Sequence, residues 1–213
     1  SDGSTDRTDE IVQGYCDTYP FIQLIRSSND ERRNFGSKVA AFNAGYQALA
    51  GHEYGFVGNL DADVSFEPDY FEKLLKRFAQ APKLGVGGGI ILELVGGKFL
   101  SQSISSNSVA GAVQLFRREC FEAIGGYRPL RGGGIDAAAE IMARERGWLV
   151  ETFSDLPVCH HRRVSRSVEL VRHHPENHFR NFFPGHVPAR IIVISVRKLR
   201  NMLSVQQSFC DAK

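Results

Sequence analysis

Two aspartates, Asp61 and Asp63, stand one residue apart directly after the apolar run 54–60. The run predicts a buried strand, and ligands bind at the carboxyl ends of strands in open α/β folds. Alternate residues of an extended chain share a face, so both carboxylates can reach one ion. Carboxylate oxygens suit a hard divalent cation that carries a phosphate-bearing substrate. The pair therefore predicts metal-assisted chemistry on a diphosphate.

A polar turn opens the sequence, which begins Ser-Asp-Gly-Ser-Thr-Asp. Such a turn presents free backbone N–H groups, and Ser4 can cap the helix that follows it. Asp2 stands in the turn, where its carboxylate can accept the N–H of a nucleobase such as uracil. A helix cap alone also explains the segment.

Helix-like and strand-like segments alternate along the first half of the chain. Apolar periodicity predicts strands at 21–25, 54–60 and 86–94, and helices after Ser4, at 34–49 and after Pro68. This order predicts the α/β class, with a Rossmann-like, mostly parallel sheet flanked by helices. A further helix is expected at 136–146, where it follows three glycines and is closed by Gly147.

The end of the chain is basic. Residues 160–200 hold nine Arg and Lys against two Glu, whereas the rest holds 17 basic and 22 acidic residues. This asymmetry predicts an anionic partner such as a membrane surface or a lipid diphosphate, although a solvated basic face explains it equally well. We expect no nucleic-acid partner, because no reader motif is present. The apolar run 187–198 predicts a helix that packs on the domain or lies in a membrane interface.

Four scattered cysteines, without a Cys-x-x-Cys pair, favour a reducing compartment over a zinc ribbon. No apolar run approaches the roughly 20 residues of a membrane-spanning helix, and no secretory signal is recognisable. We therefore expect a cytoplasmic protein, peripheral at the inner face of the membrane if its basic tail binds lipid.

Five motifs, in the same order, resemble the signatures of the family 2 glycosyltransferases, which are inverting enzymes of the GT-A fold. They are Ser-Asp-Gly-Ser-Thr-Asp at 1–6, the Asn-x-Gly-x-x-x-Ala-x-Asn-x-Gly-like helix at 34–45, Leu-Asp-Ala-Asp at 60–63, Gly-Gly-Tyr at 125–127 and His-His-Arg-Arg at 160–163. The resemblance covers residues 1–165 and leaves 166–213 as a basic, helical C-terminal extension. The family's first strand and helix precede the first motif, so we expect them upstream of Ser1.

The resemblance implies a role for each motif. It implies that Asp2 binds the nucleobase, most often uracil, that Lys38 contacts the nucleotide and that Asp61 holds the ribose. It implies that Asp63 ligates Mg²⁺ or Mn²⁺ between the two phosphates. His160, or else the adjacent histidine, adds a metal ligand or touches the diphosphate.

Asp136 is the expected catalytic base. The family's acidic helix often begins Glu-Asp, and here Ile135 precedes Asp136, so only the aspartate is retained. A helix start after flexible glycines lies beside a loop that can close over substrate. The carboxylate would take the proton of an acceptor hydroxyl, whereas a simple helix cap is the competing role. Glu140, one turn later, is expected to be an exposed helix residue.

These roles predict transfer of a sugar from a nucleotide-diphosphate sugar, most often a UDP-sugar, to a saccharide or lipid-linked acceptor. A nucleotidyltransferase is one alternative, since it also uses paired carboxylates and Mg²⁺, but the position of its Gly-rich basic loop lies upstream of this sequence. A non-catalytic nucleotide-binding module is another. The helix at 34–45 favours the glycosyltransferase.

Overall fold

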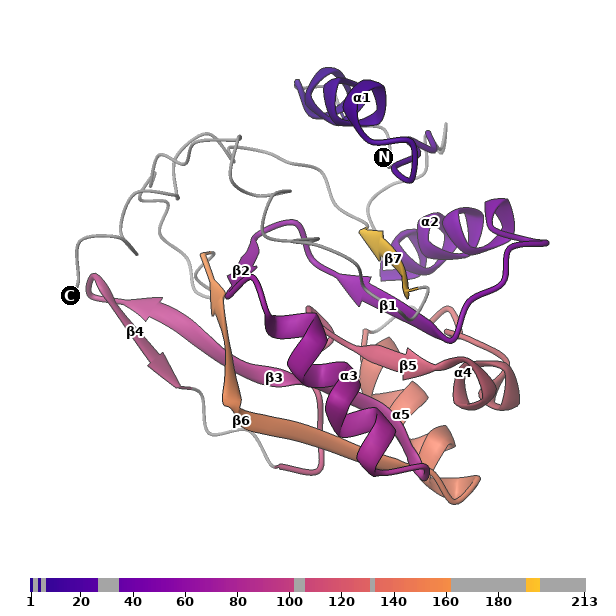
Figure 1. Cartoon of the computed structure of the whole chain (residues 1–213), viewed down its shortest axis with the longest axis vertical. Coiled ribbons are helices and arrows are strands. Elements are labelled where there is room, and N and C mark those ends of the chain that lie inside the picture. The colour runs from indigo at the N-terminus through magenta and orange to yellow at the C-terminus, as the bar shows by residue number, and fades with distance from the viewer. Residues whose placement is uncertain are drawn as a thin grey trace.

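The computed structural model describes residues 1, 4, 7–26, 35–101, 106–130, 133–161 and 191–195. The elements in chain order are α1 (Thr8–Thr18), α2 (Phe35–Ala48), β1 (Phe56–Leu60), β2 (Val64–Phe66), α3 (Tyr70–Gln80), β3 (Leu84–Val95), β4 (Lys98–Ser101), β5 (Leu115–Arg117), α4 (Arg118–Ile124), α5 (Ile135–Glu145), β6 (Leu149–His160) and β7 (Ile191–Ser195). Figure 1 shows a central sheet with α3 on one face and α5 on the other. The α/β class with a helix-flanked sheet is thus confirmed.

The strand order is β2-β6-β3-β5-β1-β7, and β4 pairs with β3 outside this path. Parallel pairing joins β1 to β7 and β3 to β6. The three shortest strands run the other way: β5 is antiparallel to β1 and β3, β2 to β6, and β4 to β3. The longer strands β1, β3, β6 and β7 thus all run in one direction, as expected, and the short return strands add antiparallel pairs between or beside them.

Apolar periodicity explains α3, which begins just after Pro68 and Asp69. Tyr70, Leu74 and Phe78 recur at four-residue spacing and are all buried, so they form one stripe against the sheet. Gly87 on β3 leaves room for this stripe, because a Cβ at that position would lie 3.0 Å from the Phe78 ring. The close approach of α3 to β3 fixes one face of the core.

An aromatic cluster connects α2 to α4 and the sheet on the side of the predicted nucleotide residues. The Phe42 ring lies 4.9 Å edge-on from Tyr127, and Phe116 and Phe121 lie 5.3 Å apart in the same cluster. Such pairs contribute about 0.5–1.5 kcal/mol each beyond their burial. The cluster holds α2, which carries Lys38, against the turn that leads to α5.

The C-terminal part differs from its prediction where the structure describes it. Residues 191–195 form the strand β7, which pairs with β1 along all five residues of that strand. The expected helix over 187–198 is wrong for these residues, because their run Ile-Ile-Val-Ile is β-branched and favours a strand. The remainder of the tail lies outside the described residues, so the domain boundary at 165 stays a prediction. No helix in the described part has the length and apolar character needed to cross a bilayer.

Candidate functional site

The first aspartate of the pair lies at the carboxyl end of β1, where it is 5% exposed. The Asp61 backbone N–H donates to the carbonyl of Ala112 at 2.9 Å. Its Oδ1 atom lies 2.9 Å from Lys38 Nζ on α2. The structure thus joins two of the residues predicted to contact the nucleotide. The ammonium group balances a carboxylate that burial would otherwise penalise.

The second aspartate lies in the turn between β1 and β2, close to the end of β6. Antiparallel pairing places Val64 opposite His160. The His160 Nε2 and Asp63 Oδ1 atoms are 3.5 Å apart, and the side chains are 13% and 17% exposed. Two residues predicted as metal ligands, 97 positions apart in the sequence, are therefore neighbours in space.

The adjacent histidine has different partners. His161 Nε2 lies 2.6 Å from Ser65 Oγ, and the imidazole contacts the Phe99 ring edge-on at 5.5 Å. The His161 backbone N–H donates to the carbonyl of Asp63 at 2.9 Å. Of the two histidines, His160 is the one whose side chain faces the Asp63 carboxylate.

The expected base, Asp136, is the second residue of α5, after Gly134 at the helix N-cap with φ 77°. Asp136 is therefore not the N-cap residue of α5. Its Oδ1 atom still accepts a hydrogen bond from the backbone N–H of Ala137 at 3.0 Å. The carboxylate packs on Gly111, since a Cβ there would lie 2.5 Å from Asp136 Oδ2. Asp136 thus faces segment 106–114, which leads into β5.

Segment 106–114 also contacts the end of β1. The Asn59 side-chain amide donates to the carbonyl of Gly111, and its backbone N–H donates to that of Gln114 at 2.8 Å. Because Asp61 donates to Ala112 of the same segment, Asp61 and Asp136 contact adjacent residues of one short stretch of chain. Asn59 was missed by the sequence reasoning, and its one signal is a polar residue inside an apolar strand.

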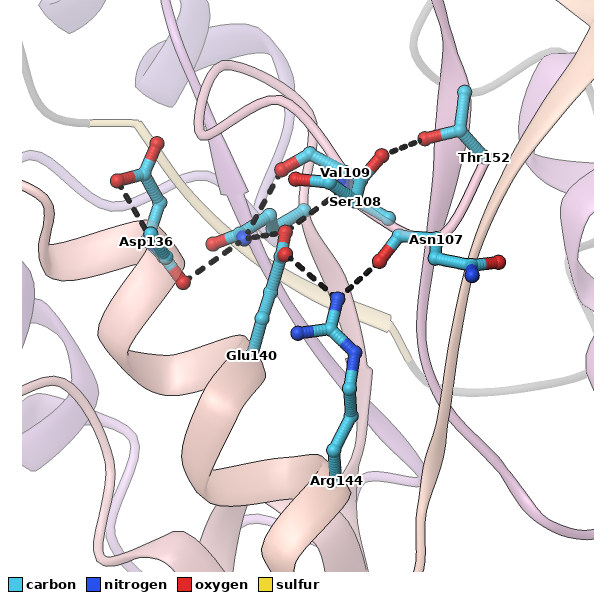
Figure 2. Close-up of polar contacts among 9 residues, drawn as sticks. Asn107, Ser108, Val109, Asp136, Glu140, Arg144 and Thr152 are labelled. Carbon is cyan, nitrogen blue, oxygen red and sulfur yellow. Dashed lines mark hydrogen bonds and ion pairs between the residues drawn. The ribbon is translucent and has the colours of Figure 1, made fainter. Parts of the chain in front are cut away.

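Glu140 corrects a prediction, because it is 2% exposed rather than a surface residue. It shares the buried face of α5 with Ala139 and Ala143. Figure 2 shows its carboxylate directed toward Val109, with Arg144 beside it. The alanines on this face were the signal, overlooked in the sequence, that the face is buried.

A divalent cation fits the Asp63 and His160 pair. His160 Nε2 is buried and makes no hydrogen bond to another described residue. The described part of the chain holds no group of three or more His, Cys, Asp or Glu side chains arranged for a metal. Since Mg²⁺ is usually held by one or two carboxylates plus substrate phosphates and water, two protein ligands suit a cation that arrives with a diphosphate. Asp2, the predicted nucleobase ligand, lies outside the described residues.

Comparisons with known proteins point to one family. The family described as glycosyl transferase family 2 matches residues 1–135, which include Lys38, Asp61 and Asp63 and end one residue before Asp136. No curated protein sequence matches the chain.

Two solved structures share the fold. The mannosyltransferase PcManGT from Pyrobaculum calidifontis, in complex with GDP-Man and Mn²⁺, has a TM-score of 0.54 and 20% identity over 74% of this chain and 45% of its own. GalNAc-T7 with UDP, GalNAc and Mn²⁺ has a TM-score of 0.55 and 13% identity over 75% of this chain and 36% of its own. The chain therefore spans less than half the length of either protein, and the similarity shows the fold.

Proposed function

The chain belongs to glycosyltransferase family 2, and from this membership we propose that it transfers a sugar from a nucleoside-diphosphate sugar to an acceptor hydroxyl. We propose a UDP-sugar donor, inversion at the anomeric carbon, and a saccharide or lipid-linked acceptor. One observation carries the proposal: Asp61, two residues before Asp63, donates its backbone N–H to Ala112, and the Asp136 carboxylate lies against the adjacent Gly111. The GDP-Man, UDP and Mn²⁺ in the two similar structures support a nucleotide donor and a divalent cation.

The donor half of the site is built from α2 and β1. In the proposal, Asp61 accepts hydrogen bonds from the hydroxyls of the ribose, and the ion pair with Lys38 holds the Asp61 carboxylate in position. Lys38 Nζ retains further donors for the phosphates, because an ammonium group carries three. Asp2 would accept the N–H of the base.

Asp63 and His160 would hold Mg²⁺ or Mn²⁺ against the diphosphate. When bound, this cation stabilises the negative charge that builds on the leaving nucleoside diphosphate. The protein's own part is to fix both ligands, and β2 and β6 do so by pairing Val64 with His160. The His161 contact to Ser65 keeps the end of β6 in place.

Asp136 would act as the general base. Its carboxylate takes the proton of the acceptor hydroxyl, and that oxygen attacks the anomeric carbon from the face opposite the departing diphosphate. The bond to the diphosphate oxygen breaks as the new glycosidic bond forms, so an α-linked donor gives a β-linked product. Asp136 and Asp61 contact adjacent residues of segment 106–114, Gly111 and Ala112, which supports a base close to the donor site.

The experiment that tests the donor site is calorimetric titration of UDP and, separately, GDP with and without Mn²⁺. We expect UDP to bind more tightly with Mn²⁺, and Asp63→Ala to remove that gain without lowering the melting temperature. Glu67→Ala, at an exposed neighbouring position, is the matched control and should bind as the unaltered chain does. Metal-dependent binding of GDP alone would move the donor to a GDP-sugar, and no binding of either nucleotide would refute the proposal.

A second assay separates transfer from the competing activity. Release of nucleoside diphosphate from a nucleotide sugar in the presence of acceptors supports glycosyl transfer. Release of pyrophosphate from a nucleoside triphosphate and a sugar phosphate would instead identify a nucleotidyltransferase.

The lipid-linked acceptor and the cytoplasmic, membrane-peripheral location are proposed from charge. The excess of Arg and Lys over residues 160–200 supports contact with anionic lipid. Co-flotation with vesicles that contain anionic lipid, but not with neutral vesicles, is the expected result. Equal recovery in both gradients would contradict it.

A further inference from the structure

Glu140 is a buried carboxylate that the proposed chemistry does not use, and it lies one helical turn after Asp136 on α5. We propose that Glu140 is a positioning residue, which clamps segment 106–114 to α5 and so holds the Asp136 carboxylate in place for proton abstraction. The catalytic meaning of this inference rests on the proposed function. The clamp itself is a structural feature with its own readout.

The Glu140 carboxylate accepts hydrogen bonds from three parts of the chain. Its Oε1 atom accepts the backbone N–H of Val109 at 2.7 Å and the side-chain amide of Gln114 at 3.1 Å. Its Oε2 atom lies 3.2 Å from a guanidinium nitrogen of Arg144 on the next turn of α5. Hydrogen bonds to an ionised acceptor are about twice as strong as those between neutral groups. The carboxylate therefore ties segment 106–114 to α5 at two residues, Val109 and Gln114.

Gln114 extends this network toward the base. It is 1% exposed, and its amide nitrogen, whose two hydrogens are shared among three acceptors, also lies 3.2 Å from the carbonyl oxygen of Val109 and 3.5 Å from that of Asp136. Its side-chain oxygen accepts the Tyr127 hydroxyl at 2.6 Å. The first turn of α5, which carries Asp136, is thus linked to the same amide that Glu140 orients.

The other side of segment 106–114 is held by β6. Arg144 donates to the carbonyl of Asn107, and the Thr152 hydroxyl donates to that of Ser108, as Figure 2 shows. The Thr152 backbone N–H donates to the carbonyl of Ser106 at 2.8 Å. The segment therefore lies between α5 and β6, and Glu140 and Arg144 supply the charged contacts on the helix side.

Segment 106–114 also contacts both Asp136 and Asp61, so its position affects the groups proposed to react. Gly111 lies under the Asp136 carboxylate and accepts a hydrogen bond from Asn59, while Ala112 accepts one from Asp61. If the segment shifts, the distance between the donor carboxylates and the base changes. Misplacement of a reacting group by 1 Å can cost on the order of 100-fold in rate.

The test uses Glu140→Ala and Glu140→Gln, with Glu145→Ala as the matched control, since Glu145 is exposed on the same helix. We expect Glu140→Ala to lower kcat at least tenfold while the affinity for nucleotide with Mn²⁺ changes less than twofold. Glu140→Gln keeps the size of the side chain and one acceptor oxygen. Its kcat should therefore lie between that of Glu140→Ala and that of the unaltered chain. A merely structural role would lower the melting temperature and leave kcat per folded molecule unchanged.

Amide hydrogen exchange supplies a readout that does not need turnover. In Glu140→Ala, and more weakly in Glu140→Gln, exchange should accelerate at Val109 and also at Asp61, whose N–H donates to Ala112 of the segment. Glu145→Ala should leave both amides protected. If Glu140→Ala does not fold, Glu140→Gln is compared with the control in the same way.

The outcomes separate the two hypotheses. If the unaltered chain binds no nucleotide and transfers no sugar, the proposed function has failed, and exchange at Asp61 alone decides for or against the clamp. If the chain is active and Glu140→Ala keeps the kcat of the control, the positioning role is overturned. Unchanged exchange at Asp61 in the Glu140 variants would also overturn it.

Discussion

A methyl group at Gly111 should displace the Asp136 carboxylate and slow sugar transfer without disturbing nucleotide binding. A Cβ at Gly111 would lie 2.5 Å from Asp136 Oδ2 and 3.0 Å from its Cβ and Cγ, whereas ordinary contacts of this kind lie at 3.4–4 Å. The backbone at Gly111 does not have the positive φ that would forbid alanine. The strain of Gly111→Ala therefore falls on the Asp136 side chain.

The size of the effect follows from these distances. Restoring an ordinary contact requires the carboxylate to move by about 1 Å, and a shift of that size costs on the order of 100-fold in rate when the group must meet a reacting proton. A side chain forced off its rotamer costs roughly 0.5–1.5 kcal/mol. We therefore expect kcat to fall between tenfold and a few hundredfold, with a modest loss of stability.

The assay is steady-state release of nucleoside diphosphate, with calorimetric affinity for nucleotide and Mn²⁺ measured on the same preparations. Gly55→Ala is the matched control, because a Cβ there meets nothing within 4 Å. In an Asp136→Asn background, Gly111→Ala should have little further effect, since the group it displaces no longer acts as a base. Wild-type kcat in Gly111→Ala, or an equal loss in both backgrounds, would refute this reasoning.

Two further predictions concern stability and reactivity. Lys38→Ala should destabilise the protein by roughly 1–3 kcal/mol, because the buried Asp61 carboxylate loses its ion pair. In thermal melts, the double variant Lys38→Ala with Asp61→Asn should recover part of that stability. No recovery in the double variant would contradict this reason for the loss. Burial raises the pKa of the Cys120 thiol to about 12 and that of Cys159 to about 11. Both thiols therefore stay protonated at pH 8. In a Cys210→Ser variant, iodoacetamide should modify Cys16 before either of them, and mass spectrometry of peptides would show the order. Modification of Cys120 before Cys16 would be inconsistent with the fold.

Local patterns in the sequence were enough to anticipate much of the framework. The apolar run before Asp61 predicted a buried strand that ends at the pair, and the spacing of Leu74 and Phe78 predicted the buried stripe of α3. Both are signals of short range, because strand and helix periodicity are set by neighbouring residues. The proximity of His160 to Asp63 was expected from the family resemblance rather than from any local pattern.

Contacts between distant segments could not be read in this way. Glu140 lies at helical spacing from Asp136, so the two share a face, yet nothing local shows that the face is covered. Its partner Val109 is 31 residues away, in a stretch without periodicity. For the same reason the tail's apolar run was expected to be a helix, whereas its pairing with β1 depends on an edge strand more than 130 residues earlier.

The position of β1 explains why one buried carboxylate can affect both halves of the site. On one edge β1 pairs with β5, and Asn59 and Asp61 continue that edge by hydrogen-bonding to segment 106–114. On the other edge all five residues of β1 pair with β7. The strand is therefore fixed on both sides, so a loosened segment must move relative to Asp61 rather than carry it along. Because Glu140 holds that segment against the helix of Asp136, we expect it to set the separation between Asp61 and the proposed base.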